Sequence, residues 1–485
     1  MPNDGARSAA PPRGVPRVRL RWLLPAGAAG VAAALAGGRH LGAESLLCVL
    51  IGLLTLAPLV GRWWEGTFDL FEPAAIVAVV YFVYFVFAPL ARFASDDLTF
   101  VGRNFEADYL PALVAVLVAV VSMWLGYALP VGPPPEPPGA PPPAVSPAAL
   151  RTARRLGWAL VGVAIVFMAL WARVAHRSFL TFLLPGLFPV ANVEDGGTDI
   201  AYLFLSIEWF IPALVVLMAG GGLRTGKRRL AAVLAVTVVY VSIGFRYRIV
   251  LLWLAVVMLT FLQAERRPRL RHLVVPGVVA FLASGWLAQA RLFFRSGGAY
   301  GGLAFNLRDA VLLGLADTRI FETFAAVPRV VPAFTGFSGL APFAYPFILP
   351  IPRSLWADKP LPRSLQDIAA SVGTPDAAGA GLFVPHFGEY YLAFGWPGIA
   401  VGMFVFGAAI KWLWRWYRAA PRDPWRQAVF VLNNALLFQV VIRGYFAQIV
   451  MEWCFLVLPA VVLTTVARRA GHDVGGVPAA KAARD

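Results

Sequence analysis

Charged residues are scarce in this chain. Of its 485 residues, 14% are charged and 59% are hydrophobic, whereas soluble globular proteins contain about 25% charged and 45–50% apolar residues. This balance excludes an ordinary soluble domain and indicates an integral membrane protein. The formal net charge of +16 does not require a nucleic-acid partner, because basic residues that flank membrane spans follow from the positive-inside rule and from anionic lipid. We therefore predict membrane lipid, and no nucleic acid, as a partner.

Cysteine and histidine are also rare. The chain has two cysteines and five histidines. Cys48 and Cys454 both lie in apolar runs, which is typical of small core side chains and argues against a disulfide or a metal-binding pair. The histidines are scattered, without the spacing of a zinc site. We predict no metal and no cofactor.

Long hydrophobic runs are abundant instead. A membrane-crossing helix needs about 20 apolar residues, and the runs predict an all-α, polytopic integral membrane protein with about twelve transmembrane helices and one large external loop. The predicted spans are residues 22–37, 41–60, 74–91, 109–129, 156–174, 200–219, 230–244, 249–262, 273–290, 391–412, 427–442 and 449–467.

The distribution of Lys and Arg predicts the topology. If the spans alternate, most basic residues fall on the side of the N-terminus, so the positive-inside rule places both termini in the cytoplasm. The predicted segments are a disordered basic cytoplasmic tail (1–21), a first helix group (22–129), a Pro-rich cytoplasmic linker with no fold of its own (130–150), a second helix group (151–290), an external catalytic loop (291–390), the last three helices (391–467) and a cytoplasmic tail (468–485).

The external loop contains a proline-flanked string that suits oxyanions. Its prolines are Pro350, Pro352, Pro360 and Pro362. They exclude a continuous helix, because each removes a backbone donor and restricts the preceding residue. Arg353, Asp358 and Lys359 are therefore expected on a bent, rigid segment. Guanidinium and ammonium groups suit phosphate, so Arg353 and Lys359 are candidate diphosphate ligands; the alternative is a solvated loop in which Arg353 pairs with Asp358.

More arginines are expected at the same external face. Arg246 and Arg248 lie in a turn so short that both must sit at the membrane boundary, where the alternative role is that of snorkelling anchors. Arg291 and Arg295 are four residues apart, so on a helix their guanidinium groups share one face. Such an excess of cations near a lipid boundary suits a polyprenyl diphosphate, whose charge must be neutralised when it is the leaving group.

Arg443 opens a further external turn. Glu452 follows it just within the last span, and an ionisable group in a span usually has a partner. Arg443 is the nearest candidate, and we predict either a structural ion pair or a contribution of Arg443 to diphosphate binding.

Four residues of the loop are candidate catalytic bases. They are His386, Glu389, Glu322 and Asp358. His386 and Glu389 are three residues apart at a helix start, so they are expected to share a face and point at one site; the alternative for His386 is an ordinary interfacial histidine. Glu322 lies near the boundary of the apolar face of an amphipathic helix predicted over 309–327.

Two parts of the loop suggest contact with a lipid-linked substrate. Residues 340–351 are apolar but too short to span, so this segment is expected to dip to the membrane surface or to re-enter as a half-helix. Residues 373–381 are rich in glycine and alanine. A loop with such a flexible stretch can open and close over a bound substrate.

The loop resembles that of the oligosaccharide repeat-unit polymerase family, the Wzy-type O-antigen and exopolysaccharide polymerases. The residues that carry the resemblance are Pro352, Arg353, Asp358, Lys359 and Pro360, followed by Gly388, Glu389, Tyr390, Phe394 and Gly395. The resemblance implies a GT-C-like glycosyltransferase architecture in a bacterial inner membrane. It also implies metal-independent transfer of a growing glycan from undecaprenyl diphosphate onto a fresh lipid-linked repeat unit.

The resemblance also assigns roles and partners. The resemblance implies that Arg353 and Lys359 bind the diphosphate, helped by Arg246, Arg248 and Arg291. Glu389 or His386 activates the acceptor on the same basis. The expected partners are undecaprenyl-diphosphate-linked glycans, a chain-length regulator and a flippase.

Three other functions compete with a polymerase. An O-antigen ligase, or another glycosyltransferase with a polyprenyl-phosphate donor, shares nearly all these features, although the string around Arg353 favours a polymerase. A flippase or transporter would more often show internal repeats and mid-membrane charges. We see no such repeat, and the polar groups cluster at one external face. A non-catalytic envelope scaffold would not need so many arginines on one external face.

Overall fold

The computed structural model is almost entirely helical. It describes residues 42–95, 98–137, 139–141, 143–174, 176, 178–182, 203–223, 225–243, 246–266, 319–351, 355–360, 362–373 and 382–475, with a few short pieces between 268 and 307. Two short strands, β1 (Thr99–Phe100) and β2 (Arg103–Asn104), pair antiparallel. Every other regular element in the described ranges is a helix, which confirms the all-α prediction.

The helices follow in chain order. The first group comprises α2 (Ala43–Trp64), α3 (Pro73–Phe82), η2 (Val83–Phe87), α4 (Ala88–Ser95), α5 (Glu106–Ala128), α6 (Pro147–Val174), η3 (Phe179–Phe182), η5 (Ser206–Trp209), α8 (Phe210–Ala219), α9 (Gly226–Ile243) and α10 (Arg246–Gln263). The second group comprises α13 (Ile320–Ala326), η6 (Val327–Arg329), α14 (Ala341–Ile348), α15 (Arg363–Val372), α16 (His386–Arg418), α17 (Pro424–Ile442), α18 (Phe446–Leu456) and α19 (Leu458–Gly475).

Seven of the described helical stretches are long and apolar enough to cross a membrane. They are Ala43–Trp64, Pro73–Phe93, Glu106–Ala128, Pro147–Val174, His386–Arg418, Pro424–Ile442 and Phe446–Gly471. Each matches one predicted span. Shorter apolar helices over Leu203–Ala219 and Tyr247–Gln263, together with α9, match three more. The predicted span 22–37 and half of the residues of the predicted span 273–290 lie outside the described residues. The membrane character of the chain is thus confirmed.

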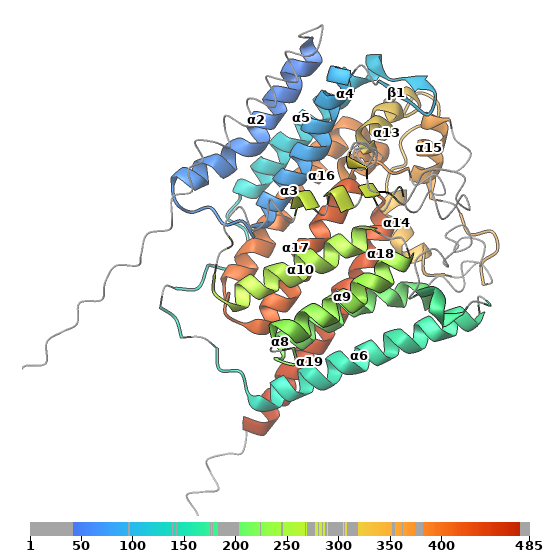
Figure 1. The fold of residues 1–485 in the computed structure, drawn as a ribbon. Coiled ribbons are helices and arrows are strands. Elements are labelled where there is room, and N and C mark those ends of the chain that lie inside the picture. Colours follow the sequence, from blue (N-terminus) through green and yellow to red (C-terminus); the bar gives the residue numbers. More distant parts are fainter. Residues whose placement is uncertain are drawn as a thin grey trace, which may run out of the picture.

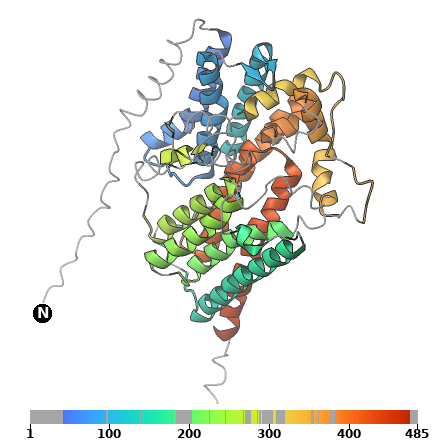
Figure 2. The same ribbon diagram turned by 45° about the vertical axis from the view of Figure 1, so that its right-hand side comes forward.

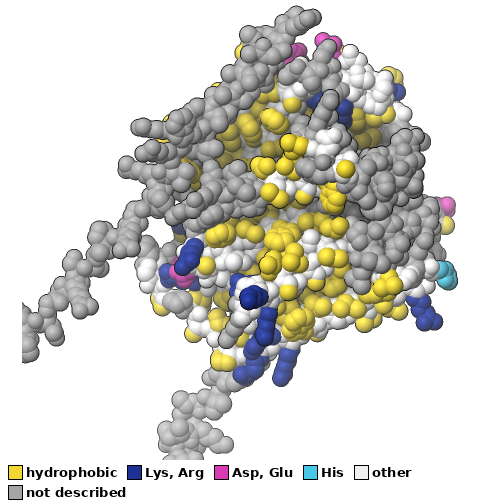
Figure 3. All heavy atoms as spheres, in the orientation of Figure 1, with side chains coloured by type: hydrophobic (Ala, Val, Ile, Leu, Met, Phe, Trp, Pro, Cys, Tyr) yellow, Lys and Arg dark blue, Asp and Glu magenta, His cyan; other side chains and the backbone are white. Residues whose placement is uncertain are grey.

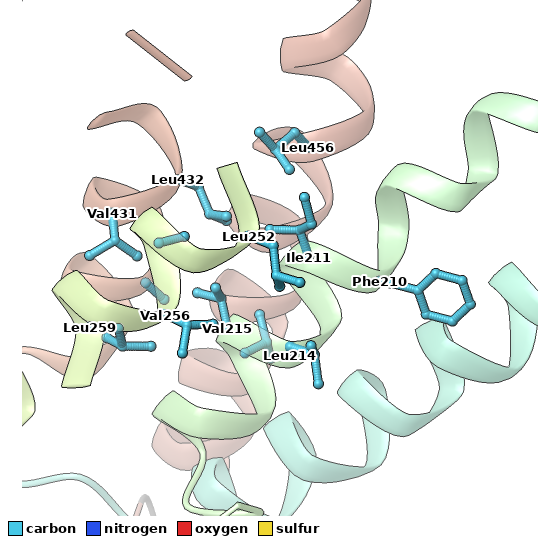
Figure 4. Close-up of a cluster of buried hydrophobic side chains, with 14 of the residues drawn as sticks. Phe210, Ile211, Leu214, Val215, Leu252, Val256, Leu259, Val431, Leu432 and Leu456 are labelled. Carbon is cyan, nitrogen blue, oxygen red and sulfur yellow. The ribbon is translucent and has the colours of Figure 1, made fainter. Parts of the chain in front are cut away.

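Two apolar cores hold these helices together. One joins α6, α8, α10, α17 and α19, and Figure 4 shows part of it, where side chains of α8, α10 and α17 gather. The other joins α3, α5, α13 and α16. Because the far end of α17 contributes to the second core as well, α17 ties the two halves of the protein together.

The outer surface is apolar, as lipid contact requires. Large hydrophobic side chains such as Trp158, Val166 and Val401 are exposed on α6 and α16. Figure 3 shows hydrophobic side chains over much of the described surface in that view, with Lys and Arg mostly towards its edges. In a water-soluble protein such a surface would be an interaction site or an aggregation hazard; on a membrane protein it is the surface that faces lipid.

The described helices of the predicted external loop lie together at one side of the protein. In Figures 1 and 2, α13, α14 and α15 (yellow to orange) are grouped on the right, and α14 packs against α18. The predicted helix 309–327 is seen over Ile320–Ala326, and residues 308–318 lie outside the described residues. The loop therefore contains short packed helices.

The Pro-rich linker lies away from the loop helices α13, α14 and α15, on the left of Figure 1. It forms no helix before α6, which begins at Pro147, inside the predicted linker 130–150. The hydroxyl of Ser146 accepts a hydrogen bond from the Ala149 amide (3.1 Å), and Ser at the N-cap followed by Pro favours a helix start. The linker is also held in place: Arg415 donates to the carbonyls of Pro130 (2.6 Å) and Pro133 (3.1 Å).

Helix α16 is broken near its start. Gly395 has φ 66° and ψ −147°, which is not helical, so the predicted span 391–412 is interrupted. The break and the missing amide hydrogen of Pro397 free carbonyl groups of the preceding turn. The loop supplies their donors: the Ser338 amide donates to Leu392 (2.8 Å) and the Gly339 amide to Ala393 (3.0 Å). The short segment before Gly395 is thereby fixed to the loop.

We expect Gly395→Ala to destabilise the protein. This region of backbone conformation is essentially restricted to glycine, and occupying it with another residue costs about 1–3 kcal/mol. An added Cβ would also lie 2.7 Å from the Phe337 ring. The measurement is the temperature at which the detergent-purified protein loses its monodisperse elution peak, which should fall by several degrees.

Gly162→Ala is the matched control. It lies within α6, and an added Cβ there meets no described atom within 4 Å, so alanine should be neutral or should stabilise the helix by up to about 1 kcal/mol. Equal unfolding temperatures for Gly395→Ala and the native chain would show that the break does not depend on glycine.

Candidate functional site

A cavity of about 240 Å³ lies where the loop meets the ends of the membrane helices. It is lined by Leu205, Glu208, Tyr247, Leu349, Lys359, Tyr445, Gln448, Met451, Glu452 and Phe455. Leu205 and Glu208 belong to η5 and the residue before it, and Tyr247 belongs to α10. Leu349 and Lys359 lie in the segment that follows α14. The other five residues belong to α18 and the turn before it. We call this space the loop cavity. Its wall is apolar on one part and carries ionisable groups on another.

Glu208 and Arg248 form a buried ion pair at the wall of the loop cavity. The Arg248 Nε lies 2.5 Å from the Glu208 Oε1, and each side chain is 2% exposed. The Tyr247 hydroxyl donates to the same carboxylate oxygen (3.3 Å). A buried pair of this kind holds its geometry because each charge would be costly to bury alone. The pair therefore fixes η5 to the start of α10.

Lys359 holds the proline-flanked segment over the cavity. Its Nζ donates to the carbonyls of Leu349 (3.0 Å), the C-cap of α14, and of Ile351 (2.9 Å), two residues further on. A lysine charge at the C-terminal end of a helix complements the helix dipole. The Tyr345 hydroxyl donates to the Pro360 carbonyl (3.1 Å). Lys359 is buried, so the ammonium group sits at the cavity wall and not in open solvent.

Arg443 contacts Tyr247, which lines the loop cavity. Its guanidinium carbon lies 5.7 Å from the Tyr247 ring centroid and 4.7 Å from that of Phe383, which are cation–π distances. The next residue, Gly444, donates its amide to the Val384 carbonyl (2.7 Å). An added Cβ at Gly444 would lie 2.4 Å from the backbone oxygen of the residue after Val384, so only glycine allows this close approach between the turn and the start of α16.

Glu452 faces the same group of charges. Its Oε1 accepts a hydrogen bond from Gln448 (2.9 Å), and its buried Oε2 has no hydrogen-bond partner among the described residues. Arg443 and Arg248 both act on it electrostatically. Lys359 thus lines the loop cavity, whereas Arg248 and Arg443 contact two of its lining residues, Glu208 and Tyr247.

Glu389 occupies a second buried position and is not among the residues that line the loop cavity. It lies in the first turn of α16 and is 2% exposed. Neither carboxylate oxygen has a hydrogen-bond partner in the part of the chain that the structure describes. Ser364 and Asp367 of α15 are the polar side chains that act on it. An unpartnered carboxylate in such a place is costly, which makes it a candidate for a role beyond folding.

Asp367 is buried beside Glu389. Burial raises the pKa of the Asp367 carboxyl above its ordinary value, against the lowering effects of the Thr335 hydroxyl and of Arg363, whose Nε lies 3.9 Å away. The buried Asp367 of α15 thus acts electrostatically on Glu389 of α16. Like charges at short range make it unfavourable for both groups to be ionised. At least one of the two carboxyl groups is therefore expected to hold a proton.

His386 does not share its surroundings with Glu389. Its Nε2 lies 3.5 Å from the Tyr81 hydroxyl and its Nδ1 lies 3.5 Å from the Val441 carbonyl oxygen. The ring packs at 4.7 Å between centroids on Phe406. These neighbours are on α3, α17 and the later part of α16, whereas those of Glu389 are on α15. The three-residue spacing of the two candidates therefore does not give them common contacts.

The two other candidate bases lie in different settings. Glu322 is buried on α13 and accepts from Tyr109 (3.4 Å), with the Arg92 Nε 3.2 Å away. Burial raises the pKa of the Glu322 carboxyl, although the Arg92 charge opposes the shift. Asp358 is exposed on the segment before Lys359. Neither residue lines the loop cavity.

Several predicted ligands lie wholly or partly outside the described residues. Arg353, Arg291 and Arg295 lie outside the described residues, and Arg246 begins α10 with its side chain outside them.

Glu208 was not predicted as a site residue. Its signal in the sequence is that it is the one acid within the apolar run 200–219, where an ionisable residue usually has a functional or structural partner.

The loop cavity places an ammonium group beside apolar side chains. Lys359 lines it together with the acids Glu208 and Glu452. An ammonium group suits a phosphate or diphosphate, and Leu205, Met451 and Phe455 on the wall suit a hydrocarbon chain. No protein-family model matches this sequence, and no solved structure matches this fold.

Proposed function

We propose that this protein is a membrane glycosyltransferase that polymerises oligosaccharide repeat units linked to undecaprenyl diphosphate. On this proposal it is a bacterial inner-membrane protein with about twelve spans, both termini in the cytoplasm, and a GT-C-like architecture. The loop cavity then opens on the external side. A chain-length regulator and a flippase are the partners that such an enzyme would need.

The observation that carries the proposal is that Lys359 lines the loop cavity while Arg248 and Arg443 contact its lining residues Glu208 and Tyr247. Cations are needed where a diphosphate leaves, because they stabilise the charge that develops on the leaving group. Glu208 and Glu452 also face the cavity. They reduce the positive charge and so keep the site from holding a diphosphate too tightly to release it.

Glu389 is the base in this proposal. The bond between the anomeric carbon of the donor sugar and the diphosphate oxygen breaks, and a bond to the acceptor oxygen forms. The proton of the acceptor hydroxyl passes to the Glu389 carboxylate, which has no described hydrogen-bond partner to displace. The hydrogen bond from Gly444 to Val384 joins the helix start that carries Glu389 to the turn that carries Arg443.

The test is the length distribution of the surface glycan. A strain without this protein should accumulate single lipid-linked repeat units and lose long chains, and the native chain should restore them. Arg443→Ala should fail to restore long chains at a normal membrane level, because the diphosphate loses a cation. The matched control is Arg228→Ala, an exposed arginine at the start of α9, which should restore them fully.

Other outcomes separate the competing functions. Full-length glycan that is not attached to its final acceptor would indicate a ligase. An unchanged glycan ladder in the strain without the protein would refute the glycan proposal and favour a transporter.

A further inference from the structure

Helix α14 exposes an apolar face that no described residue covers. Leu340 (72% exposed) and Phe347 (81%) are seven residues apart, so they lie on the same side of the helix. Ala341 and Ala344 are exposed on this side too, while Pro342, Tyr345 and Pro346 are buried. The flanking residues Phe334 (82%) and Leu355 (80%) are equally exposed. We call Phe334, Leu340, Phe347 and Leu355 the α14 patch.

The composition of α14 identifies its surroundings. A surface helix in water carries charged or polar residues on its outer side, but α14 has the sequence Ala-Pro-Phe-Ala-Tyr-Pro-Phe-Ile, without a charged residue. Its eight residues are far fewer than the roughly 20 that a span requires. The helix is therefore too apolar for water and too short to cross a bilayer.

The patch continues the lipid-facing surface of α16. The Phe343 ring stacks on Phe394 (6.3 Å between centroids) and contacts Phe446 (5.2 Å). Phe394 and Trp396 are exposed where the long part of α16 begins, and α16 is one of the helices able to span the membrane. Aromatic residues gather at the membrane–water boundary. Lipid that covers this end of α16 therefore also reaches α14.

We propose that α14 and its flanks are an interfacial membrane anchor, with the α14 patch inserted among the lipids of the bilayer that the protein spans. Lys359 supports this arrangement, because it satisfies the carbonyls of Leu349 and Ile351 that a lipid environment could not. Leu349 and Lys359 also line the loop cavity. The anchor thus places the cavity at the level of the lipid headgroups. This inference needs only the geometry of α14 and holds whether or not the protein transfers sugars.

The test places a fluorophore on the patch. Phe347→Cys is made in the full-length chain with Cys48 and Cys454 replaced by alanine, labelled with a small fluorophore and reconstituted in liposomes. Gln366→Cys, at an exposed position of α15 in the same loop, is the matched control. Both must elute as the native chain does.

Insertion predicts a clear difference between the two sites. Lipids with a nitroxide near the headgroup should quench the label at position 347 at least about threefold more than the label at 366, as expected for an interfacial helix that lies 5–10 Å into the headgroup boundary. Aqueous iodide should show the reverse order. Equal quenching of both sites by iodide would overturn the anchor. A different result would indicate a contact with a second copy of the chain and would also overturn the anchor. In that case the label at position 347 would be protected from iodide but not quenched by the lipid nitroxide, and the protection would increase with protein density.

Discussion

Replacing Glu389 by glutamine is expected to abolish the long glycan chains while leaving the protein folded. Glutamine has nearly the same volume but cannot accept the acceptor proton, and loss of a general base costs about 10²–10⁴-fold in rate. Because Glu389 is buried without a described hydrogen-bond partner, the uncharged amide should not lower stability. The measurements are the glycan ladder in a complemented strain and the transfer rate of the purified protein with a lipid-linked repeat unit.

Two controls make this result specific. Glu106→Gln removes an exposed carboxylate from the first turn of α5 and should retain full activity. His386→Gln should reduce activity much less than Glu389→Gln, because His386 lies among Tyr81, Val441 and Phe406. The reverse ranking of the two variants would move the role of base from Glu389 to His386.

The membrane helices were predictable because their signal is local. A span is an uninterrupted apolar run, and the predicted run 109–129 lies almost entirely within α5 (Glu106–Ala128). The break in α16 was not predictable, because its stability depends on donors from Ser338 and Gly339, which are more than fifty residues away in the chain. A glycine and a proline in the run hint at a break, but many membrane helices contain them without breaking.

The charges at the site were predictable in type but not in pairing. Their position next to membrane boundaries identified Arg248 and Arg443, and the proline-flanked string identified Lys359. In the structure Lys359 lines the loop cavity, and Arg248 and Arg443 contact residues that line it. The sequence could not show that Glu208 pairs with Arg248, since the contact joins elements forty residues apart. It also could not show that Lys359 bonds to carbonyls of the preceding helix end, because such bonds depend on how the prolines bend the chain.

The Glu208 and Arg248 pair gives the largest expected effect on stability. Arg248→Met should lower the free energy of unfolding by about 3–5 kcal/mol, because it leaves the Glu208 carboxylate buried without its charge partner. Both side chains are 2% exposed, so water cannot replace the lost interaction. The measurement is denaturant or thermal unfolding of the purified protein. The double variant Arg248→Met with Glu208→Gln should recover most of the loss, since replacing a whole buried pair by neutral groups is often nearly neutral.

The double variant also separates the structural role of Arg248 from its proposed role in binding. It should be folded, yet it lacks the cation that pairs with Glu208 at the wall of the loop cavity. If Arg248 helps to bind a diphosphate, the double variant should be stable but poor in polymerisation, with a raised KM for the lipid-linked donor. If it is both stable and fully active, Arg248 serves only to neutralise Glu208, and the diphosphate must be bound by Lys359 and Arg443 with residues outside this pair.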